Sequence, residues 1–382
     1  GSTAATLLAQ HGRRVLMIER ARHPRFHIGE SMLPCSTPVL ERLGIQLEAS
    51  GYQHKDGAEF IDEATGKSIR FALNARYQPY QVERARFDHC LADNAVAQGV
   101  TLHQEETVRA VHVDAAIAAV ETDRQRYTAR YLVDATGRSA FMGRQTSAIR
   151  RIGGLGCFAL YRHYRVSSPQ ASALFESGDI KVLMQDIGWI WIIPLANERL
   201  SVGLVVRDKS ATALRGAALF ENYLAASPLL QDLLSGAVAE AGVRSEADFS
   251  FSNRQRYGQR YACCGDAAGF LDPVFSSGVF LALVGAERVA DRVNEALANA
   301  TEAQASMLAM DAQVFEEGFS TMRLFIERFY RSDMVQRLFF EADRSETIKQ
   351  QISALLSGDL WRSDNAFQRM LLEGRQGRKR TA

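Results

Sequence analysis

The sequence has no run of uncharged apolar residues long enough to cross a membrane. Its most apolar stretch, 270–285, contains Asp272 and Pro273, whereas a membrane-spanning helix needs about 20 apolar residues. No signal peptide is recognisable. An excess of one charge is also missing, since 45 Lys and Arg residues stand against 44 Asp and Glu residues. We therefore expect neither nucleic-acid binding nor stable membrane insertion.

Cysteine is scarce, and its positions form no CxxC spacing, which argues against a disulfide framework or a structural zinc site. A reducing cytoplasm is the expected location. The eight histidines show no HExxH or two-His-one-carboxylate spacing, so we expect no metal site. There is also no GxSxG nucleophile elbow and no GxGxxG for a nicotinamide cofactor. The five cysteines are Cys35, Cys90, Cys157, Cys263 and Cys264.

The N-terminal residues predict the second half of a dinucleotide-binding unit. Residues 1–9 show the pattern of a small-residue amphipathic helix, which Gly12 terminates as a C′ glycine. Residues 15–19 form an apolar strand that ends on Glu19. A complete unit begins with a strand and GxGxxG, and its acid follows about 20 residues later. Because Gly1 can only be the last of these glycines, we expect a sequence truncated before its first strand.

Two more segments show a strand running into a glycine turn. Residues 131–137 read YLVDATG, and residues 261–269 read YACCGDAAG before a predicted helix at 278–297. A GDxxG turn places a carboxylate and unhindered amides beside a helix N-terminus, where a ribityl hydroxyl and a pyrophosphate can bind. The alternative for Asp266 is a cap on a tight strand-to-helix turn.

The chain, 382 residues with 47% hydrophobic side chains, is long enough for one or two domains. We predict an α/β fold with a dinucleotide-binding domain at 1–150 and 252–300. Alternating patterns predict an inserted domain with a mixed β-sheet at 151–251. Residues 301–376 predict a helical C-terminal region. Its broad apolar face consists of Phe315, Phe319, Met322, Phe325, Ile326, Phe329 and Tyr330.

Together these elements resemble the Rossmann-like FAD-binding domain of the glutathione-reductase and para-hydroxybenzoate-hydroxylase type. Residues 82–88 match its V-x-R-x-x-F-D signature, in which the Arg84 position lies against the dinucleotide. The alternative for Arg84 is a surface cation that begins a helix. The resemblance implies a set of cofactor-binding positions. These are Gly1, Ser2, Glu19, Arg20, Arg84, Asp134, Gly137, Gly265, Asp266 and Gly269.

Two motifs resemble those of the flavin-dependent halogenases. Residues 189–194 match W-x-W-x-I-P, and residues 270–278 match F-x-x-P-x-x-S-x-G. Residues 25–31 also match the R-x-x-x-GES run, which related flavin monooxygenases and reductases share. In the family, the first motif is associated with keeping substrate away from the flavin. Trp189 and Trp191, two apart in a strand, point the same way and can wall a substrate cavity with Pro194 and Phe275; the alternative is ordinary core packing.

Lys55 precedes a Gly-Ala pair and matches the lysine of phenol- and pyrrole-type halogenases. The resemblance implies that this lysine hydrogen-bonds hypohalous acid or forms a chloramine; the alternative is a solvated lysine in a turn. Ser277 and Gly278 hold the family's halide positions, where helix-terminal amides can bind a small anion. Tryptophan-type enzymes carry a glutamate where this chain has Phe275. We therefore expect a phenol, a pyrrole or a similar ring, either free or on a carrier protein.

The resemblance thus implies a halogenase that uses reduced FAD from a separate flavin reductase, oxygen, and chloride or bromide to form hypohalous acid. One rival is an FAD-dependent aromatic monooxygenase or a prenyl-reductase-like oxidoreductase on the same scaffold. Another is an inactive fragment, because a missing first strand removes the centre of the dinucleotide-binding sheet. On that ground we expect the chain as written to bind FAD poorly.

Overall fold

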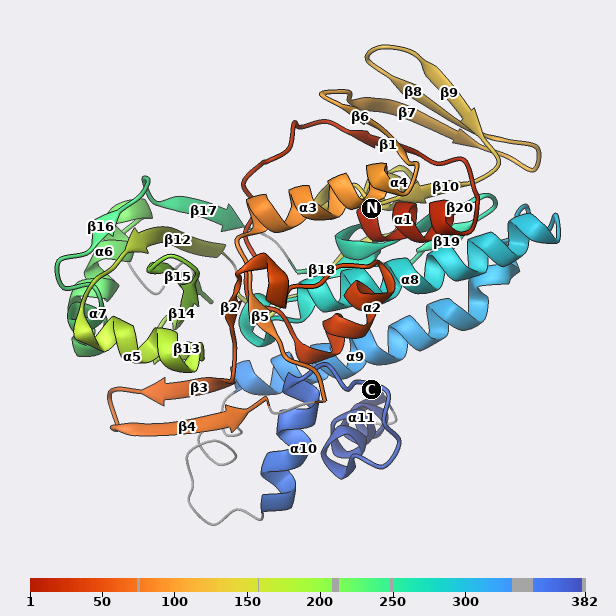
Figure 1. Cartoon of the computed structure of the whole chain (residues 1–382). Coiled ribbons are helices and arrows are strands. Elements are labelled where there is room, and N and C mark those ends of the chain that lie inside the picture. Colours follow the sequence, from red (N-terminus) through yellow and green to blue (C-terminus); the bar gives the residue numbers. More distant parts are fainter. Residues whose placement is uncertain (74–75, 157, 208–212, 248–249, 332–345, 380–382) are drawn as a thin grey trace.

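The computed structural model describes all residues except 74–75, 157, 208–212, 248–249, 332–345 and 380–382 (Figure 1). The helices of the described residues are α1 (Ser2–Gln10), α2 (Thr37–Arg42), α3 (Arg84–Ala97), α4 (Phe141–Gln145), α5 (Pro169–Ser177), α6 (Gly216–Ala226), α7 (Pro228–Leu233), α8 (Ser277–Ala298), α9 (Ala309–Arg331), α10 (Glu346–Leu356) and α11 (Ala366–Lys379). The strands are β1 (Leu16–Glu19), β2 (Gln53–His54), β3 (Gly57–Asp62), β4 (Lys67–Ala72), β5 (Tyr80–Gln81), β6 (Thr101–Gln104), β7 (Val108–Val113), β8 (Ala118–Thr122), β9 (Arg126–Ala129), β10 (Leu132–Asp134), β11 (Ile149–Arg151), β12 (Phe158–Arg165), β13 (Ile180–Gln185), β14 (Gly188–Leu195), β15 (Arg199–Val206), β16 (Val238–Ala239), β17 (Arg244–Ala247), β18 (Phe251–Asn253), β19 (Tyr257–Gly258), β20 (Tyr261–Cys263) and β21 (Gly269–Phe270).

The predicted helix and strand at the start of the chain are confirmed as α1 and β1. Strand β1 pairs in parallel with β6, and β10 pairs in parallel with β20. Helix α1 packs against α3 and α8, because Ala4, Leu7 and Leu8 form one buried face of the helix. Strands β7, β8 and β9 form a separate antiparallel sheet at one end of the molecule (Figure 1).

A mixed eight-stranded sheet dominates the other half of the molecule, with the order β16-β12-β15-β14-β13-β3-β4 and with β17 also paired to β12. Strand β3 runs parallel to β13, and β3 and β4 form an antiparallel hairpin. The predicted β-rich segment at 151–251 therefore supplies most of this sheet. Two of its strands, β3 and β4, come instead from residues 57–72, within the segment predicted to belong to the dinucleotide-binding domain. Alternation alone did not reveal that β3 belongs beside β13.

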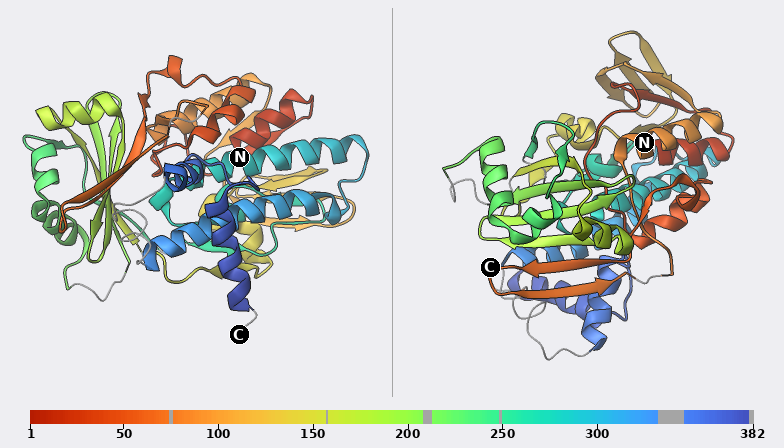
Figure 2. Two further views of the ribbon diagram at one scale, coloured as in Figure 1. Left: turned by 90° about the horizontal axis from the view of Figure 1, so that it is seen from below. Right: turned by 60° about the vertical axis from the view of Figure 1, so that its left-hand side comes forward.

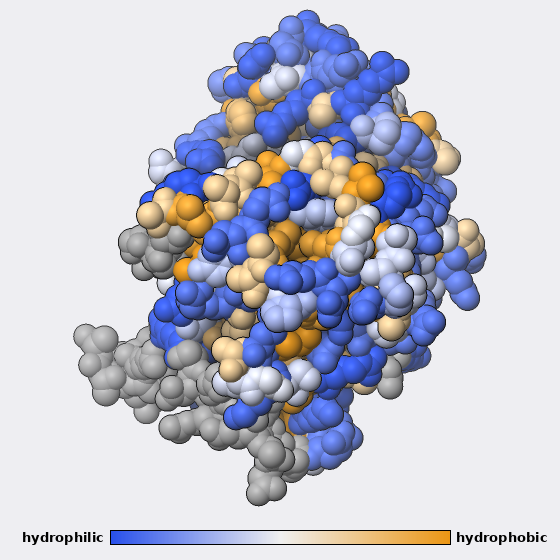
Figure 3. Space-filling model, turned by 90° about the vertical axis from the view of Figure 1, so that its left-hand side faces the viewer, coloured by the Kyte–Doolittle hydropathy of each residue, from blue (hydrophilic) through white to orange (hydrophobic). Residues whose placement is uncertain are grey.

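Side chains of the sheet alternate between two hydrophobic cores. On β14, Trp189, Trp191 and Ile193 face the core that contains α9, whereas Ile190 and Ile192 face the core that contains α5, α6 and α7. Figure 2 shows α5–α7 on the outer side of the sheet and the C-terminal helices on its inner side. The outer side of the molecule is covered mainly by polar residues, with apolar residues between them (Figure 3). The period-two pattern thus places both tryptophans on the inner face.

The apolar stripe predicted in the C-terminal region lies on α9, and all seven of its residues are buried. Helix α9 contacts α8 and α11, and α10 contacts β4. Part of the predicted helical region, 332–345, lies outside the described residues. Within the part of the chain that the structure describes, no helix is long and apolar enough to cross a membrane.

Candidate functional site

A group of charged side chains lies where β1 ends and α3 begins. Arg84 contacts Asp88 through two hydrogen bonds of 2.8 and 3.1 Å, and Arg25 contacts both Asp88 at 3.1 Å and Glu19 at 3.4 Å. Burial alone would raise the pKa of Asp88, but the two arginines outweigh it and hold this pKa below its usual value. Arg84 does begin a helix, as the alternative proposed, yet its side chain is only 13% exposed.

The Arg84 guanidinium also donates to the backbone carbonyl oxygens of Ile28 and Gly29, each at 3.2 Å. A Cβ on Gly29 would lie 3.1 Å from Arg84 Nη1, so this glycine lets the GES loop approach the guanidinium. Glu19, in addition to its ion pair, accepts a hydrogen bond of 2.9 Å from the Ala21 amide. This cluster fixes the loop after β1 against α3.

The two glycine turns differ in how their aspartates are used. Asp134 accepts hydrogen bonds from the Thr136 amide and hydroxyl and from the Met142 amide, so its carboxylate shapes its own turn. Asp266 has no hydrogen-bond or ion-pair partner among the described residues, and it does not cap the short helix that follows β20. Burial raises the pKa of Asp266 to about 6, although Arg84, Arg138 and the amino terminus oppose this rise. Asp266 is therefore available to a ligand.

These features fit a dinucleotide such as FAD. Helix α1 has no side-chain cap, so its first amides are free to bind phosphate. The unpartnered carboxylate of Asp266 suits a ribityl hydroxyl. Gly1, Ser2, Gly137, Gly265 and Gly269 lie at turns or helix starts of this half, whereas Arg20 is exposed. Contact of each predicted position with the cofactor stays a prediction.

Lys55 is buried, with 2% of its surface exposed, which is incompatible with a solvated lysine in a turn. Its Nζ donates to Ser31 Oγ at 2.9 Å and to the Met32 carbonyl oxygen at 3.2 Å. Burial lowers the pKa of Lys55 to about 7, and the nearby charge of Asp179 only partly opposes this shift. At neutral pH, both the ammonium and the amine are therefore populated.

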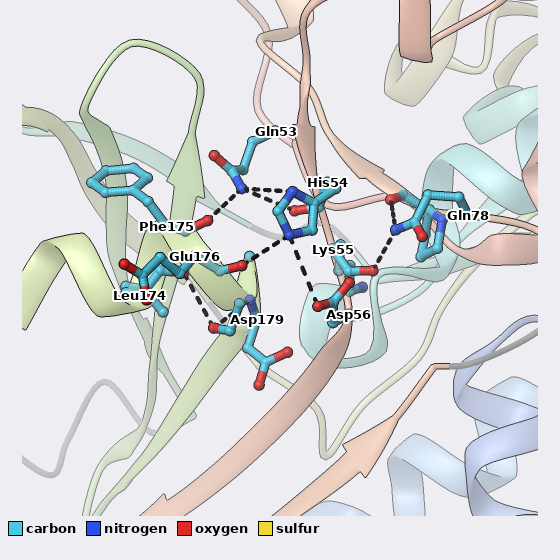
Figure 4. Close-up of polar contacts among 12 residues, drawn as sticks. Gln53, His54, Lys55, Asp56, Gln78, Leu174, Phe175, Glu176 and Asp179 are labelled. Atoms are coloured by element: carbon cyan, nitrogen blue, oxygen red, sulfur yellow. Dashed lines mark hydrogen bonds and ion pairs between the residues drawn. The ribbon is translucent and has the colours of Figure 1, made fainter.

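Hydrogen bonds to backbone carbonyl oxygens hold the segment that carries Lys55 between β5 and the end of α5 (Figure 4). Gln53 Nε2 donates to the Phe175 carbonyl oxygen at 2.8 Å, and the Lys55 amide donates to the Pro79 carbonyl oxygen at 3.0 Å. Position 57, two residues after the lysine, requires a glycine for a steric reason. A Cβ on Gly57 would lie 2.9 Å from Asp179 Oδ1, in the space that the ion pair of Asp179 with Arg70 occupies.

Lys55 opens onto a small apolar pocket that also reaches the residues before α8. Lys55 is the only charged side chain among the described residues that line it, and Phe275 and Ser276 also belong to the lining. The lining consists of Leu33, Lys55, Ala58, Phe60, Leu73, Ile180, Val182, Val274, Phe275, Ser276 and Leu356. Phe275 stacks on Phe325 with ring centroids 4.1 Å apart and meets Phe329 edge to face. Phe275, at the position where tryptophan-type enzymes carry a glutamate, is thus part of an aromatic cluster.

The start of α8 has the properties of an anion site. Ser277 and Gly278 are the first two residues of this 22-residue helix. The Ser277 hydroxyl is buried and has no hydrogen-bond partner among the described residues. A Cβ on Gly278 would make only an ordinary van der Waals contact with Phe270, at 3.4 Å, so no side chain crowds the backbone here. Free amides and an unpartnered hydroxyl fit a halide ion.

Trp189 and Trp191 share one face, as predicted, with ring centroids 6.0 Å apart. Both are buried, and neither they nor Pro194 line the pocket of Lys55. Trp191 Nε1 donates to Ser201 Oγ at 3.1 Å, and Trp189 Nε1 donates to the Tyr330 hydroxyl at 2.7 Å. The structure therefore brings together Lys55, Phe275 and the start of α8, with the tryptophans packed in the adjoining core. Their role as cavity walls stays a prediction.

Sequence reasoning missed three polar residues near the site. Ser31 is the serine of the GES motif, and its place within a family motif was a signal that could have identified it. Asp272 lies inside the second motif, and Tyr330 was counted only as part of an apolar stripe. In the part of the chain that the structure describes, no group of three or more His, Cys, Asp and Glu residues could hold a metal ion.

Comparison with known proteins gives consistent matches over most of the chain. The family model described as tryptophan halogenase matches residues 65–370. A tryptophan 2-halogenase of Chondromyces crocatus is 32% identical over 358 residues, which cover 89% of this chain and 67% of that protein. A 1H-pyrrole-2-carbonyl peptidyl-carrier-protein chlorinase of Pseudomonas fluorescens is 27% identical, and the match covers 94% of this chain and 87% of that protein. The structure of the myxobacterial chondrochloren halogenase, an FAD-dependent enzyme, superposes with a TM-score of 0.73 at 28% identity and covers 96% of this chain and 90% of that one.

Proposed function

Because the chain belongs to the tryptophan halogenase family and is a flavin-dependent halogenase of aromatic rings, we propose that Lys55 delivers the halogen in its apolar pocket. The predicted α/β fold of an FAD-dependent halogenase is confirmed by the same matches. The observation that carries the proposal is the position of Lys55. It is the only charged side chain among the described residues that line a pocket reaching the start of α8.

Bound FAD, reduced by a separate flavin reductase, supplies with oxygen the oxidising power that converts chloride or bromide to hypohalous acid. The amides and hydroxyl at Ser277 and Gly278 hold the halide before this conversion. Gly1, Ser2, Arg84 and Asp266, with the other predicted positions, hold the cofactor. None of these side chains takes part in forming the carbon–halogen bond.

Lys55 acts on the hypohalous acid. An ammonium has three N–H donors, and Ser31 and Met32 accept two of them. The remaining N–H can donate to the oxygen of hypohalous acid and make the halogen more electrophilic. The ring carbon then bonds to the halogen while the oxygen–halogen bond breaks, and the ring proton leaves with the oxygen as water. The net reaction replaces one ring hydrogen by a halogen.

The pocket favours a small electron-rich ring. Its lining is apolar apart from Lys55 and Ser276, and Phe275 offers no carboxylate to activate a less reactive ring. We therefore propose a phenol or a pyrrole, either free or tethered. The similarity to a chlorinase that acts on a pyrrole held by a carrier protein supports the tethered form, whereas the similarity to a tryptophan halogenase makes tryptophan the main competitor. All described cysteines are free thiols, which suits a cytoplasmic location beside the reductase.

A turnover assay tests the reaction and the ring class together. The protein is supplied with FAD, a flavin reductase, oxygen and bromide, and a panel of phenols, pyrroles and tryptophan is analysed by mass spectrometry. We expect the isotope doublet of bromine on a phenol or pyrrole. Oxygenated products that persist without halide would assign the chain to the rival monooxygenase class, and bromotryptophan as the main product would overturn the proposed ring.

Substitution of the lysine tests its role separately. We expect Lys55→Met to lower ring halogenation by a factor of about 10² or more, because the donor to the hypohalous acid is lost. Hypohalous acid captured by an added scavenger should continue to form. The matched control is Lys67→Met, which changes an exposed lysine on β4. A Lys55→Met variant that halogenates at the parental rate contradicts the proposal.

A further inference from the structure

A chain of buried hydrogen bonds joins the two motifs that resemble those of halogenases. Trp189 Nε1, on β14, donates to the Tyr330 hydroxyl at 2.7 Å. The same hydroxyl, near the end of α9, donates to Asp272 Oδ2 at 2.8 Å. All three side chains are at most 6% exposed. One tyrosine therefore links the tryptophan strand to the loop that leads into α8.

Asp272 fixes the shape of this loop. Its Oδ1 accepts from the Val274 amide at 3.1 Å, and its Oδ2 also accepts from the Gly156 amide at 2.9 Å. A Cβ on Gly156 would lie 2.5 Å from Asp272 Oδ2 and 3.2 Å from the Tyr330 hydroxyl. Glycine at this position therefore leaves the space in which the carboxylate and the phenol meet.

The loop needs such support because its last residue has an unfavourable backbone conformation. Ser276, which precedes α8, has a φ of +55°, in the left-handed region. A non-glycine residue there persists only where the surrounding structure holds it. The next residue, Ser277, has a buried hydroxyl that finds no partner among the residues the structure describes, so its side chain adds no hydrogen bond from these residues to secure the turn.

We propose that Tyr330 is a positioning residue that, through Asp272, holds the 272–277 loop so that the start of α8 can receive the halide. This inference rests on the proposed halide site at Ser277 and Gly278. It also explains a difference between the two tryptophans of the motif. Trp191 bonds to Ser201 within its own sheet, whereas Trp189 supports the loop through Tyr330.

The substitution Tyr330→Phe tests the inference because it keeps the ring and removes only the hydroxyl. Asp272 then loses one donor, and the Trp189 N–H loses its acceptor. We expect the halide KM to rise by about 10-fold or more, as for the loss of a buried hydrogen bond to a charged group. The KM for the aromatic substrate should rise much less, because most of the residues that line its pocket lie outside this loop. A general loss of packing would not separate these two constants.

A second measurement needs no turnover. Hydrogen exchange followed by mass spectrometry on the cofactor-free protein should show faster exchange in the peptide that covers 272–280 in Tyr330→Phe than in the parent. The matched control is Ser201→Ala, which removes the buried partner of the other tryptophan and should leave both the exchange of this peptide and the halide KM unchanged.

The outcomes separate this inference from the proposed function. Unchanged exchange at 272–280 in Tyr330→Phe overturns the positioning role. Faster exchange with an unchanged halide KM overturns the link to halide and places the halide site elsewhere. If Tyr330→Phe does not fold, Trp189→Phe takes its place, because it keeps the bond between Tyr330 and Asp272 and should give a smaller increase in the same two quantities. No increase in either one overturns the inference.

Discussion

Two groups of buried ionisable side chains in this molecule are built in opposite ways. At the end of β1, Asp88 lies between Arg25 and Arg84, and these arginines hold its pKa below the usual value against the effect of burial. Around the apolar pocket, burial prevails. It lowers the pKa of Lys55 to about 7 and raises that of Asp272 to about 6.

The difference indicates what each group is for. Paired charges of fixed sign stabilise a loop and tolerate changes of pH, which suits a cofactor-binding frame. Groups whose charged and neutral forms are both accessible near pH 7 suit proton transfer and polarisation of a reactant, and such groups are concentrated at active sites. The fold therefore separates a cluster of permanent charges from buried groups whose charge is held weakly, which lie at the pocket and at Asp266 of the cofactor-binding half.

The largest expected change in stability comes from breaking the charged frame. Asp88→Ala leaves Arg25 and Arg84 close together without their shared carboxylate, so we expect the free energy of unfolding to fall by about 3 kcal/mol. Urea denaturation at pH 7 measures this change. Asp93→Ala on the same helix is the matched control, because Asp93 is 66% exposed and should cost less than about 0.5 kcal/mol. Equal losses in the two variants would mean that the frame is no more than a surface ion pair.

The titration of Lys55 should appear in the pH dependence of stability at neutral to alkaline pH, unlike that of the arginine-bound Asp88. Its folded-state pKa, about 7, lies below the usual value of 10.5. Between these values the unfolded state holds a proton that the folded state has released, so this lysine makes the stability rise with pH. From pH 7 to pH 9, the free energy of unfolding of the parent should rise by about 2 kcal/mol relative to Lys55→Met.

Urea denaturation of both proteins at pH 7, 8 and 9 provides the measurement, and the difference between them removes the contribution of other groups. Parallel pH profiles would show that Lys55 keeps an ordinary pKa in the folded protein. The pocket would then hold a permanent charge, and the comparison with the arginine frame would fail.

Much of this arrangement could be predicted from local sequence patterns. The helix and strand at the N-terminus follow from periodicity, as does the shared face of Trp189 and Trp191. The apolar stripe of α9 follows from spacings of three and four. The motif around Lys55 drew attention to this lysine from the residue order of a short segment alone, and its function stays a prediction. These features depend on neighbours within about two turns or one strand.

The remaining features depend on contacts between distant segments. Strand β3 joins the large sheet through a parallel pairing with β13, more than a hundred residues later, and parallel partners leave no turn signal between them. Tyr330 has the position of a core residue in its stripe, and only the folded chain brings its hydroxyl to Asp272. The weakly held charge of Lys55 is likewise a property of burial, which its polar neighbours Asp56 and Gln53 conceal in the sequence.

The smallest expected effect concerns the contact that orients Lys55. Ser31→Ala removes the side-chain acceptor that Nζ has among the described residues, while the Met32 carbonyl oxygen remains. We expect kcat for ring halogenation to fall by about 3- to 10-fold, the effect of one hydrogen bond of about 1 kcal/mol, with the halide KM unchanged.

The control for this variant is Ser36→Ala, another buried serine, whose hydroxyl has no partner among the described residues. Its removal should leave kcat unchanged, since no contact to the lysine is lost. Equal rates in Ser31→Ala and the parent would show that the Met32 carbonyl alone orients the amine. A loss as large as that of Lys55→Met would instead make Ser31 part of the chemistry. An intermediate loss distinguishes a residue that orients the lysine from one that takes part in the reaction.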